Sequence, residues 1–307
     1  MTVGWVAAST RGRALVGRIV GADRSRALVA LDWPEARHAL TSTGYGRDLA
    51  ADATRHEARH AAMEATSWQL RVLAGWLPPG QGRLARLFAA PLEIANIELH
   101  LASLDGEQRT ESALRLGSLA TAWPQVARCR STDAVRTVLT TSVWGDPGGV
   151  DRASFALGLR LGWARRLAGQ SPVLERWAKG GAAVLVARER FAFDRELNHP
   201  TSDVADNLLG RRWRTANSLA EFRHHLTDAA SWSLVGVENP EDLWRAEAAV
   251  ARRVEAESVP MAASSKPDRS VVIGIMSLML IDLRRVLAIV ELAGRGPDPV
   301  EVFDAVA

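Results

Sequence analysis

The stretch Leu40-Thr41-Ser42-Thr43-Gly44-Tyr45-Gly46 occurs three times along the chain in diverged form. Its second copy reads Leu139-Thr140-Thr141-Ser142-Val143-Trp144-Gly145, with the leucine, the Leu-Thr pair, the aromatic residue and the glycine in register. The third copy, Leu226-Thr227-Asp228-Ala229-Ala230-Ser231-Trp232, keeps the Leu-Thr pair but carries its aromatic residue one position later. Internal similarity at a near-even spacing indicates that one structural unit has been repeated.

The residues before each copy support this interpretation. Asp32, Ser131 and Ser218 each lie eight positions ahead of the leucine, and each can accept a backbone N–H at the start of a helix. Ser218 and Glu221 also have the spacing of a capping box. Each copy therefore predicts a helix cap, a two-turn helix, a Leu-Thr pair and then an aromatic residue before a break.

Most of the remaining sequence has the periodicity of amphipathic helices. Apolar residues recur every three or four positions, as at Trp68, Val72, Leu73 and Trp76. Turn signals rich in Pro and Gly separate these segments. The one candidate for a short strand is residues 27–31, and the fold class predicted for the chain is all-α.

A second repeated feature is an apolar helix that carries a polar residue. Residues 91–101 include Glu93 and Asn96, and residues 280–287 repeat the pattern with Asp282 at the position of Asn96. The corresponding middle segment, residues 180–191, keeps the apolar stripe without that polar position. Units of roughly 90–100 residues are longer than ordinary solenoid repeats. We therefore expect one composite domain of three pseudo-symmetric lobes, 22–110, 111–205 and 206–307, preceded by an N-terminal helix in residues 1–21.

Composition and charge are those of a globular protein. The 307 residues are 47% hydrophobic and 24% charged, with a formal net charge of +3. Acidic residues are mixed among the basic ones, so no nucleic-acid partner is expected. Cys129 is the only cysteine, which excludes an intrachain disulfide and a cysteine-based zinc site and is typical of a reducing cytosol.

The sequence predicts no direct membrane span. The start of the chain lacks a basic region followed by an apolar one, so no signal peptide is expected. The most apolar stretch, residues 271–281, is about half the length that a membrane-spanning helix needs. We interpret it as a buried core helix, with a membrane anchor as the alternative.

Two of these motifs together resemble those of the C subunit of V/A-type ATPases, the family of vacuolar ATPase subunit d. The first is a helix running into L-x-x-T-x-Y-G, here Leu40, Thr43, Tyr45 and Gly46. The second is a helix reading E-I-x-N-I, here Glu93 to Ile97, and residues 150–155 resemble the L-D-R-x-Y-F start of the family's central lobe. Ser154 replaces the tyrosine there, and Met279 stands where the last copy would carry an acid.

This resemblance implies a funnel-shaped, all-helical body with no active site and no cofactor of its own. Such a subunit belongs to the central stalk of a rotary motor. It lies on the cytoplasmic face of the membrane and links the rotor shaft to the membrane proteolipid ring. It transmits torque for proton or sodium ion transport, in ATP synthesis or hydrolysis. The repeat residues assigned by this interpretation are Leu40, Tyr45, Gly46, Leu139, Trp144, Gly145, Leu226, Trp232, Glu93, Asn96 and Asp282.

The main alternative is a zinc metallopeptidase built on His56-Glu57-Ala58-Arg59-His60. On a helix the two imidazoles of H-E-x-x-H share a face and the glutamate can act as the base. Arg55 and Arg59 place positive charge beside the site, which opposes a divalent cation. No third ligand is marked, so we do not assign a metal site to His56, Glu57 and His60.

Three other interpretations follow from the residues. The segment from Gly12 to Ile19 nearly has the spacing of a phosphate-binding loop, but Arg18 and Ile19 replace its lysine and hydroxyl, so we interpret it as a helix with glycines at close packing points. Tyr45, Trp144 and Trp232 are expected to close each lobe rather than to line a ligand pocket. A generic helical adaptor is the remaining alternative for the function.

Overall fold

The computed structural model describes residues 3–107, 112–296 and 298–306, and within these ranges every regular element is helical. The predicted all-α class is confirmed. The candidate strand at residues 27–31 is not formed, because Ala27, Leu28 and Val29 lie at the end of a helix that begins at Ala22. A short apolar run can belong to either element, and only its packing decides between them.

The chain divides into two compact units. Unit 1 comprises residues 1–92, 110–119 and 251–307, and unit 2 comprises residues 93–109 and 120–250. These units do not follow the boundaries of the three predicted lobes, and the lobes and the funnel shape remain predictions. The helices α5 (Gly82–Leu104) and α13 (Leu243–Ala263) each contribute residues to both units.

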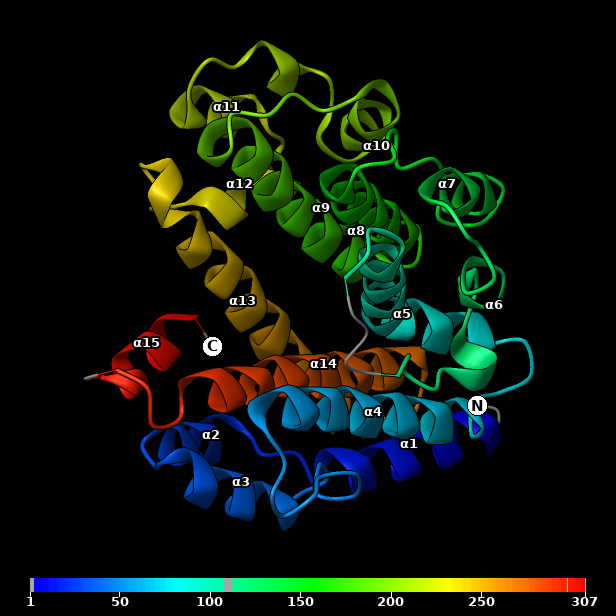
Figure 1. Ribbon diagram of the computed structural model, residues 1–307, viewed down its shortest axis with the longest axis vertical. Coiled ribbons are helices and arrows are strands. Elements are labelled where there is room, and N and C mark those ends of the chain that lie inside the picture. Colours follow the sequence, from blue (N-terminus) through cyan, green and yellow to red (C-terminus); the bar gives the residue numbers. More distant parts are fainter. Residues whose placement is uncertain (1–2, 108–111, 297, 307) are drawn as a thin grey trace. The chain divides into compact units, whose positions relative to one another are not determined.

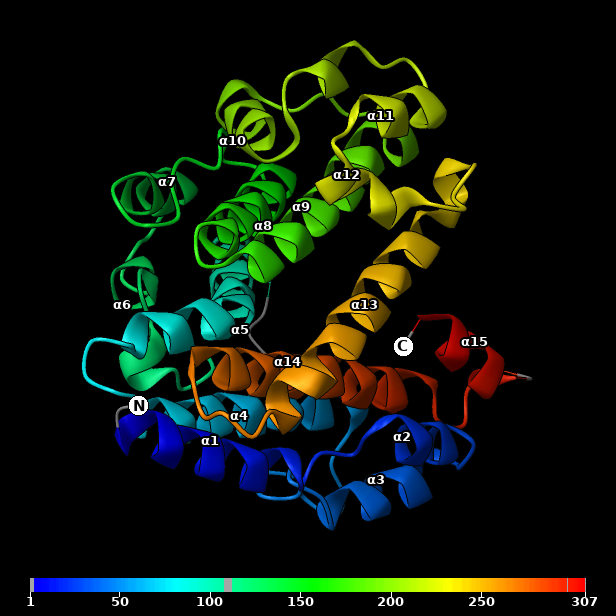
Figure 2. The ribbon, with the colours of Figure 1, turned by 180° about the vertical axis from the view of Figure 1, so that it is seen from behind.

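Unit 1 is organised around one buried helix, α14. Its complete α-helices are α1 (Val3–Val16), α2 (Ala22–Val29), α3 (Trp33–Thr41), α4 (Arg55–Ala74), α14 itself (Arg269–Leu292) and α15 (Pro299–Val306). The helices α1 and α4 run beside α14 (Figures 1 and 2), and α2, α3 and α15 also pack against it. Nearly every residue from Val271 to Met279 is buried, which confirms the interpretation of this stretch as a core helix.

The N-terminal helix predicted in residues 1–21 corresponds to α1. Gly12 of this helix is buried, and a Cβ atom at that position would lie 2.8 Å from the side chain of Ile275 in α14. The glycine therefore permits close packing of the two helices, as the sequence predicted, and the segment does not form a phosphate-binding loop.

Unit 2 contains a pair of long helices with shorter ones packed on them. Its complete α-helices are α6 (Trp123–Val126), α7 (Thr132–Thr140), α8 (Arg152–Ala168), α9 (Pro172–Ala187), α10 (His199–Leu209), α11 (Leu219–His225) and α12 (Asp228–Ser231). Short helical turns lie at 117–119 in unit 1 and at 188–192, 212–215, 232–234 and 240–242 in unit 2. The helices α8 and α9 pack side by side, and α10 and α12 pack against α9 (Figure 1).

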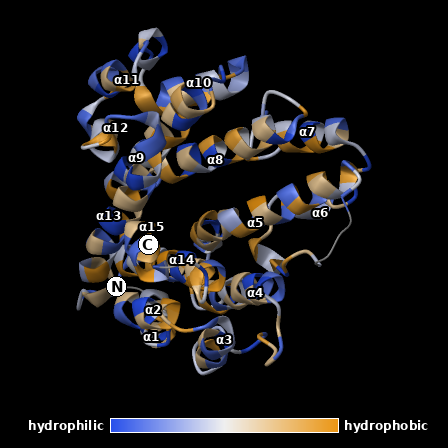
Figure 3. Cartoon of the chain, turned by 60° about the vertical axis from the view of Figure 1, so that its left-hand side comes forward, coloured by the Kyte–Doolittle hydropathy of each residue, from blue (hydrophilic) through white to orange (hydrophobic). Residues whose placement is uncertain are grey.

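The helices are amphipathic, as the periodicity predicted. Figure 3 shows both hydrophilic and hydrophobic residues on nearly all of them. Among the described residues, α5 is the one helix that is long and apolar enough to cross a membrane, but 67% of its apolar window is buried within the protein. Buried core helices pass the same length and composition test, so this finding is weak evidence for a span.

The three predicted helix caps are confirmed. The side chain of Asp32 accepts the backbone N–H of Glu35, that of Ser131 accepts Ala134, and that of Ser218 accepts Glu221. These residues begin α3, α7 and α11, so each sequence copy starts a helix in the same way.

Candidate functional site

The aromatic residue of the first copy binds a buried carboxylate that lies on a distant helix. Asp282, on α14, accepts the backbone N–H groups of Val20 at 3.0 Å and Gly21 at 2.8 Å. Its Oδ2 also accepts the hydroxyl of Tyr45 at 2.8 Å. Because Gly21 is the N-cap of α2, one carboxylate holds both the start of α2 and the aromatic residue that follows α3. We call Asp282, Val20, Gly21 and Tyr45 the first node.

The backbone after α3 places Tyr45 in this position. The hydroxyl of Thr43 donates to the carbonyl of Leu40 at 2.7 Å and accepts the backbone N–H of Tyr45 at 3.2 Å. Gly46 follows, where a Cβ atom would lie 1.8 Å from the carbonyl oxygen of Thr41. Leu40 and Tyr45 are both buried, so the turn directs the phenol into the core.

A second buried carboxylate occupies the equivalent place in unit 2. Oε1 of Glu93, on α5, accepts the backbone N–H groups of Thr121 at 2.7 Å and of Ala122 and Trp123 at 2.8 Å. Oε2 of Glu93 accepts the hydroxyl of Thr121. The indole N–H of Trp144 donates to that same hydroxyl at 3.0 Å. We call Glu93, Thr121, Ala122, Trp123 and Trp144 the second node.

The two nodes are built by the same local pattern. Ser142 donates to the carbonyl of Leu139 at 2.7 Å and accepts the backbone N–H of Trp144 at 3.2 Å, which repeats the bonds made by Thr43 in the first copy. Gly145 follows with a φ of 83°, a left-handed conformation that favours glycine. Each node therefore joins a long helix, the start of a short helix and the aromatic residue after the next helix.

The structure changes how the acidic positions correspond. The sequence pattern aligned Asp282 with Asn96. In the structure Asp282 makes the same kind of contacts as Glu93, which lies one helical turn before Asn96. Asn96 is buried on α5 beyond Glu93. Arg285 lies three residues beyond Asp282 and donates to Glu255 at 2.7 Å. The acid of the last copy is therefore Asp282 and not the residue at position 279.

The third copy keeps the cap and the aromatic residue but not the carboxylate. Leu226 ends α11 as its C-cap rather than lying inside the helix, as Leu40 and Leu139 do. The indole of Trp232 donates to the carbonyl of Ala229 at 3.0 Å and packs on α9, where a Cβ at Gly180 would lie 2.4 Å from the ring.

An arginine acts where the first two copies use an acid. Arg190, in the π-helical turn Arg188–Ala192 that continues α9, donates to the carbonyls of Trp213 at 2.8 Å and Ala216 at 2.9 Å. A guanidinium therefore holds the end of the short helical turn Arg212–Thr215, instead of a carboxylate holding a helix start.

Burial perturbs the titration of the first node. Burial raises the pKa of Tyr45 well above its ordinary value of 10.0, and the negative charge of Asp282 raises it further. Burial also raises the pKa of Asp282 above 3.8, although the hydrogen bonds from Gly21, Val20 and Tyr45 act in the opposite direction. The phenol therefore remains a hydrogen-bond donor at neutral pH.

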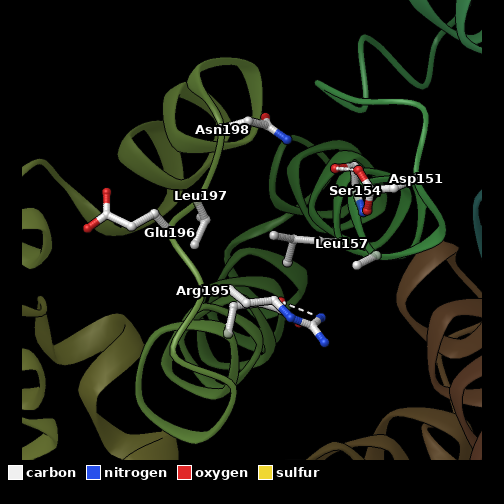
Figure 4. A pocket seen from close by; sticks show the side chains of 9 residues that line it. Asp151, Ser154, Leu157, Arg195, Glu196, Leu197 and Asn198 are labelled. Carbon is white, nitrogen blue, oxygen red and sulfur yellow. Dashed lines mark hydrogen bonds and ion pairs between the residues drawn. The ribbon is translucent and has the colours of Figure 1, made fainter.

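A pocket of about 320 Å³ lies in unit 2, at the start of α8 (Figure 4). Asp151, Ser154 and Leu157 line one side, and residues 195–198 line the other with Glu189. Two of its polar side chains, Asp151 and Asn198, cap helices. Asp151 accepts the N–H and hydroxyl of Ser154 at 2.9 and 2.6 Å, and Asn198 accepts the N–H of Thr201 at 3.1 Å. The segment that resembles the family's central-lobe start is therefore the capped beginning of a helix.

The H-E-x-x-H motif begins α4. Glu57 accepts the backbone N–H of Thr54 at 2.7 Å and its hydroxyl at 2.8 Å, while the side chain of Thr54 accepts the N–H of Glu57. Glu57 therefore closes a capping box. Within the described parts of the chain, no group of three His, Cys, Asp or Glu residues is arranged to hold a metal ion.

Comparison with known proteins assigns no family to the chain. No family model matches it, and no curated protein matches it.

Proposed function

We propose that the chain is a non-catalytic coupling subunit of a V/A-type rotary ATPase. In this role it links the rotor shaft to the membrane proteolipid ring on the cytoplasmic face. The observation that carries the proposal is the agreement between the two nodes. Tyr45 and Glu93, which the sequence resemblance singled out, lie in equivalent buried networks built on different helices.

The order of the helices supports a closed arrangement of modules. In the second copy the carboxylate lies on α5, directly before the short helices that it holds, and in the third copy Trp232 packs on α9, directly before its own module. In the first copy the corresponding helix is α14, near the other end of the chain. In a ring of three modules, the carboxylate that binds the first module would lie on a helix near the end of the chain, as Asp282 of α14 does.

The nodes also suit a part that transmits torque. Asp282 binds donors from two different segments directly, and Glu93 binds one segment directly and a second through the hydroxyl of Thr121, so the segments cannot slide past each other without breaking these hydrogen bonds. Close packing around the nodes gives a body of low compressibility. Such a body needs stiffness and docking faces rather than a catalytic cluster.

The zinc peptidase gains no support from the geometry. Glu57 would have to act as the base on a metal-bound water, but its carboxylate binds the N–H and hydroxyl of Thr54 at the start of α4.

The proposal is tested by affinity purification of the full chain from its native membranes, solubilised in mild detergent. We expect the rotor-shaft subunits and the proteolipid ring to co-purify in fixed stoichiometry. Deletion of the gene should abolish ATP-driven ion transport while the soluble sector still hydrolyses ATP. A folded, tagged chain that recovers no ATPase subunits would contradict the proposal.

A further inference from the structure

Three segments of unit 1 carry basic residues with almost no acidic ones. Residues 1–22 and 65–92 contain three arginines each and no Asp or Glu, and residues 258–281 contain Lys266 and Arg269 against Asp268 alone. Together these segments carry +7, whereas the whole chain carries +3, so the rest of the chain is net acidic. The even mixing of charges expected from the sequence therefore does not hold in these three segments.

The three segments pack together. A Cβ atom at Gly4 of α1 would lie 3.0 Å from Pro78, in the turn after α4, and one at Gly12 would lie 3.4 Å from Leu73 and 2.8 Å from Ile275. Arg13 donates to the carbonyl of Ala262, at the end of α13, at 3.0 Å. The start of α1 consequently lies beside the end of α4, as Figure 1 shows.

Exposed apolar side chains lie at this same end. Val3 is 85% exposed, Val6 is 43% exposed, and Trp76 is 50% exposed although tryptophan is highly buried on average. Arg11 and Arg13 are exposed farther along α1, and Arg83 is exposed at the start of α5. We call Val3, Val6 and Trp76, together with the exposed arginines Arg11 and Arg83 of the same segments, the apolar–basic end of unit 1.

We propose that the apolar–basic end of unit 1 binds the surface of an anionic phospholipid bilayer. Tryptophan and valine insert at the boundary between headgroups and acyl chains, and arginines around them bind the lipid phosphates. A nucleic acid would bind the same positive charge, but the exposed side chains of Val3 and Val6 would not contribute to that binding. This inference does not rest on the proposed function, because docking to a protein ring requires no direct contact with lipid.

The experiment is flotation of the purified full chain with lipid vesicles. The vesicles contain either phosphatidylcholine alone or phosphatidylcholine with roughly one-third phosphatidylglycerol. One double variant, Arg11→Glu with Arg83→Glu, reverses two charges of the proposed surface, and Arg128→Glu with Arg130→Glu reverses two exposed charges in unit 2 as its control. Trp76→Glu is paired with Val235→Glu, which alters an exposed apolar residue of unit 2. Circular dichroism establishes that each variant is folded.

We expect binding to the anionic vesicles and little binding to phosphatidylcholine. Each arginine near an anionic surface changes partitioning roughly fivefold, so the Arg11 and Arg83 variant should bind at least about twentyfold more weakly. Trp76→Glu should also weaken binding, and both controls should bind like the native chain. Failure to float with anionic vesicles would overturn the inference. Equal binding by the two charge-reversal variants would also overturn it. So would binding to DNA that is as tight as binding to the anionic vesicles and is unaffected by Trp76→Glu.

Discussion

Tyr45 donates its hydroxyl to Asp282 at 2.8 Å, although 237 residues separate the two along the chain. Both side chains are buried, and the same carboxylate accepts the N–H groups that begin α2. This bond ties the first repeated segment to the last long helix. It has a counterpart in unit 2, where Glu93 holds α6 and, through Thr121, Trp144.

Removal of the carboxylate in the first node should destabilise the protein strongly. Asp282→Ala leaves the N–H groups of Val20 and Gly21 and the hydroxyl of Tyr45 without their acceptor, so we expect the free energy of unfolding to fall by about 3–5 kcal/mol. Urea denaturation measures this change. Asp105→Ala, at an exposed aspartate, is the control and should change stability by less than about 0.5 kcal/mol. Equal effects from the two substitutions would show that the first node is not formed.

Glu93→Ala should have a comparable effect that is localised in unit 2. The N–H groups of Thr121, Ala122 and Trp123 lose their acceptor, so we expect a loss of about 3–5 kcal/mol. Hydrogen exchange should accelerate at residues 121–123. Glu238→Ala, at an exposed glutamate of the same unit, should leave that exchange unchanged. Unaltered protection at 121–123 in Glu93→Ala would rule out the capping role.

The two repeat glycines should tolerate alanine poorly, for different reasons. At Gly46 the new Cβ would meet the carbonyl oxygen of Thr41, and we expect a loss of about 3 kcal/mol. At Gly145 the cost is the left-handed conformation, about 1–2 kcal/mol. Gly82→Ala has open space around it and should be neutral within about 0.5 kcal/mol. Thermal unfolding of the three variants tests this order, and an equally mild Gly46→Ala would contradict the turn geometry.

Glu57 should act in helix capping and not in metal chemistry. Hydrogen bonds from Thr54 lower the pKa of Glu57 below its ordinary 4.5. Because the folded-state pKa is the lower one, the stability contributed by Glu57 is present above pH 4.5 and is lost as the pH falls through the folded-state value. Glu57→Gln should therefore reduce the acid sensitivity of unfolding in this range. Elemental analysis should find no stoichiometric zinc, and zinc that is lost in His56→Ala would favour the peptidase.

Local features of the fold could be predicted from the sequence. The caps at Asp32, Ser131 and Ser218 follow from residue type and spacing, because an N-cap bonds only to residues two or three positions away. Thr54 and Glu57 have the same kind of spacing, a threonine three residues before a glutamate, so their capping box is also predictable from residue type and spacing. The first two copies share their turn geometry because the hydrogen bonds of Thr43 and Ser142 reach only residues two or three positions away.

The nodes themselves could not be predicted in this way. Which acid on a long apolar helix serves as the cap depends on a segment that is distant in the chain, so the pattern assigned Asp282 to the position of Asn96. The use of Arg190 in the third copy has the same origin, since its acceptors at Trp213 and Ala216 are fixed by packing. Periodicity locates an element and its buried face, but not the partner of a buried charge.

Titration of the phenol in the folded protein tests the first node most directly, because Tyr45 is the only tyrosine in the chain. Its tyrosinate absorbance can be followed against pH in the native chain and in Asp282→Asn. Burial and the charge of Asp282 both raise its pKa, so the native phenol should titrate well above 10.0, and the stability that it contributes should be lost as the pH rises through that value. In Asp282→Asn the pKa should fall but stay above 10.0, because burial remains. A native phenol that titrates near 10.0 without unfolding, or at the same pH in both proteins, would contradict the account.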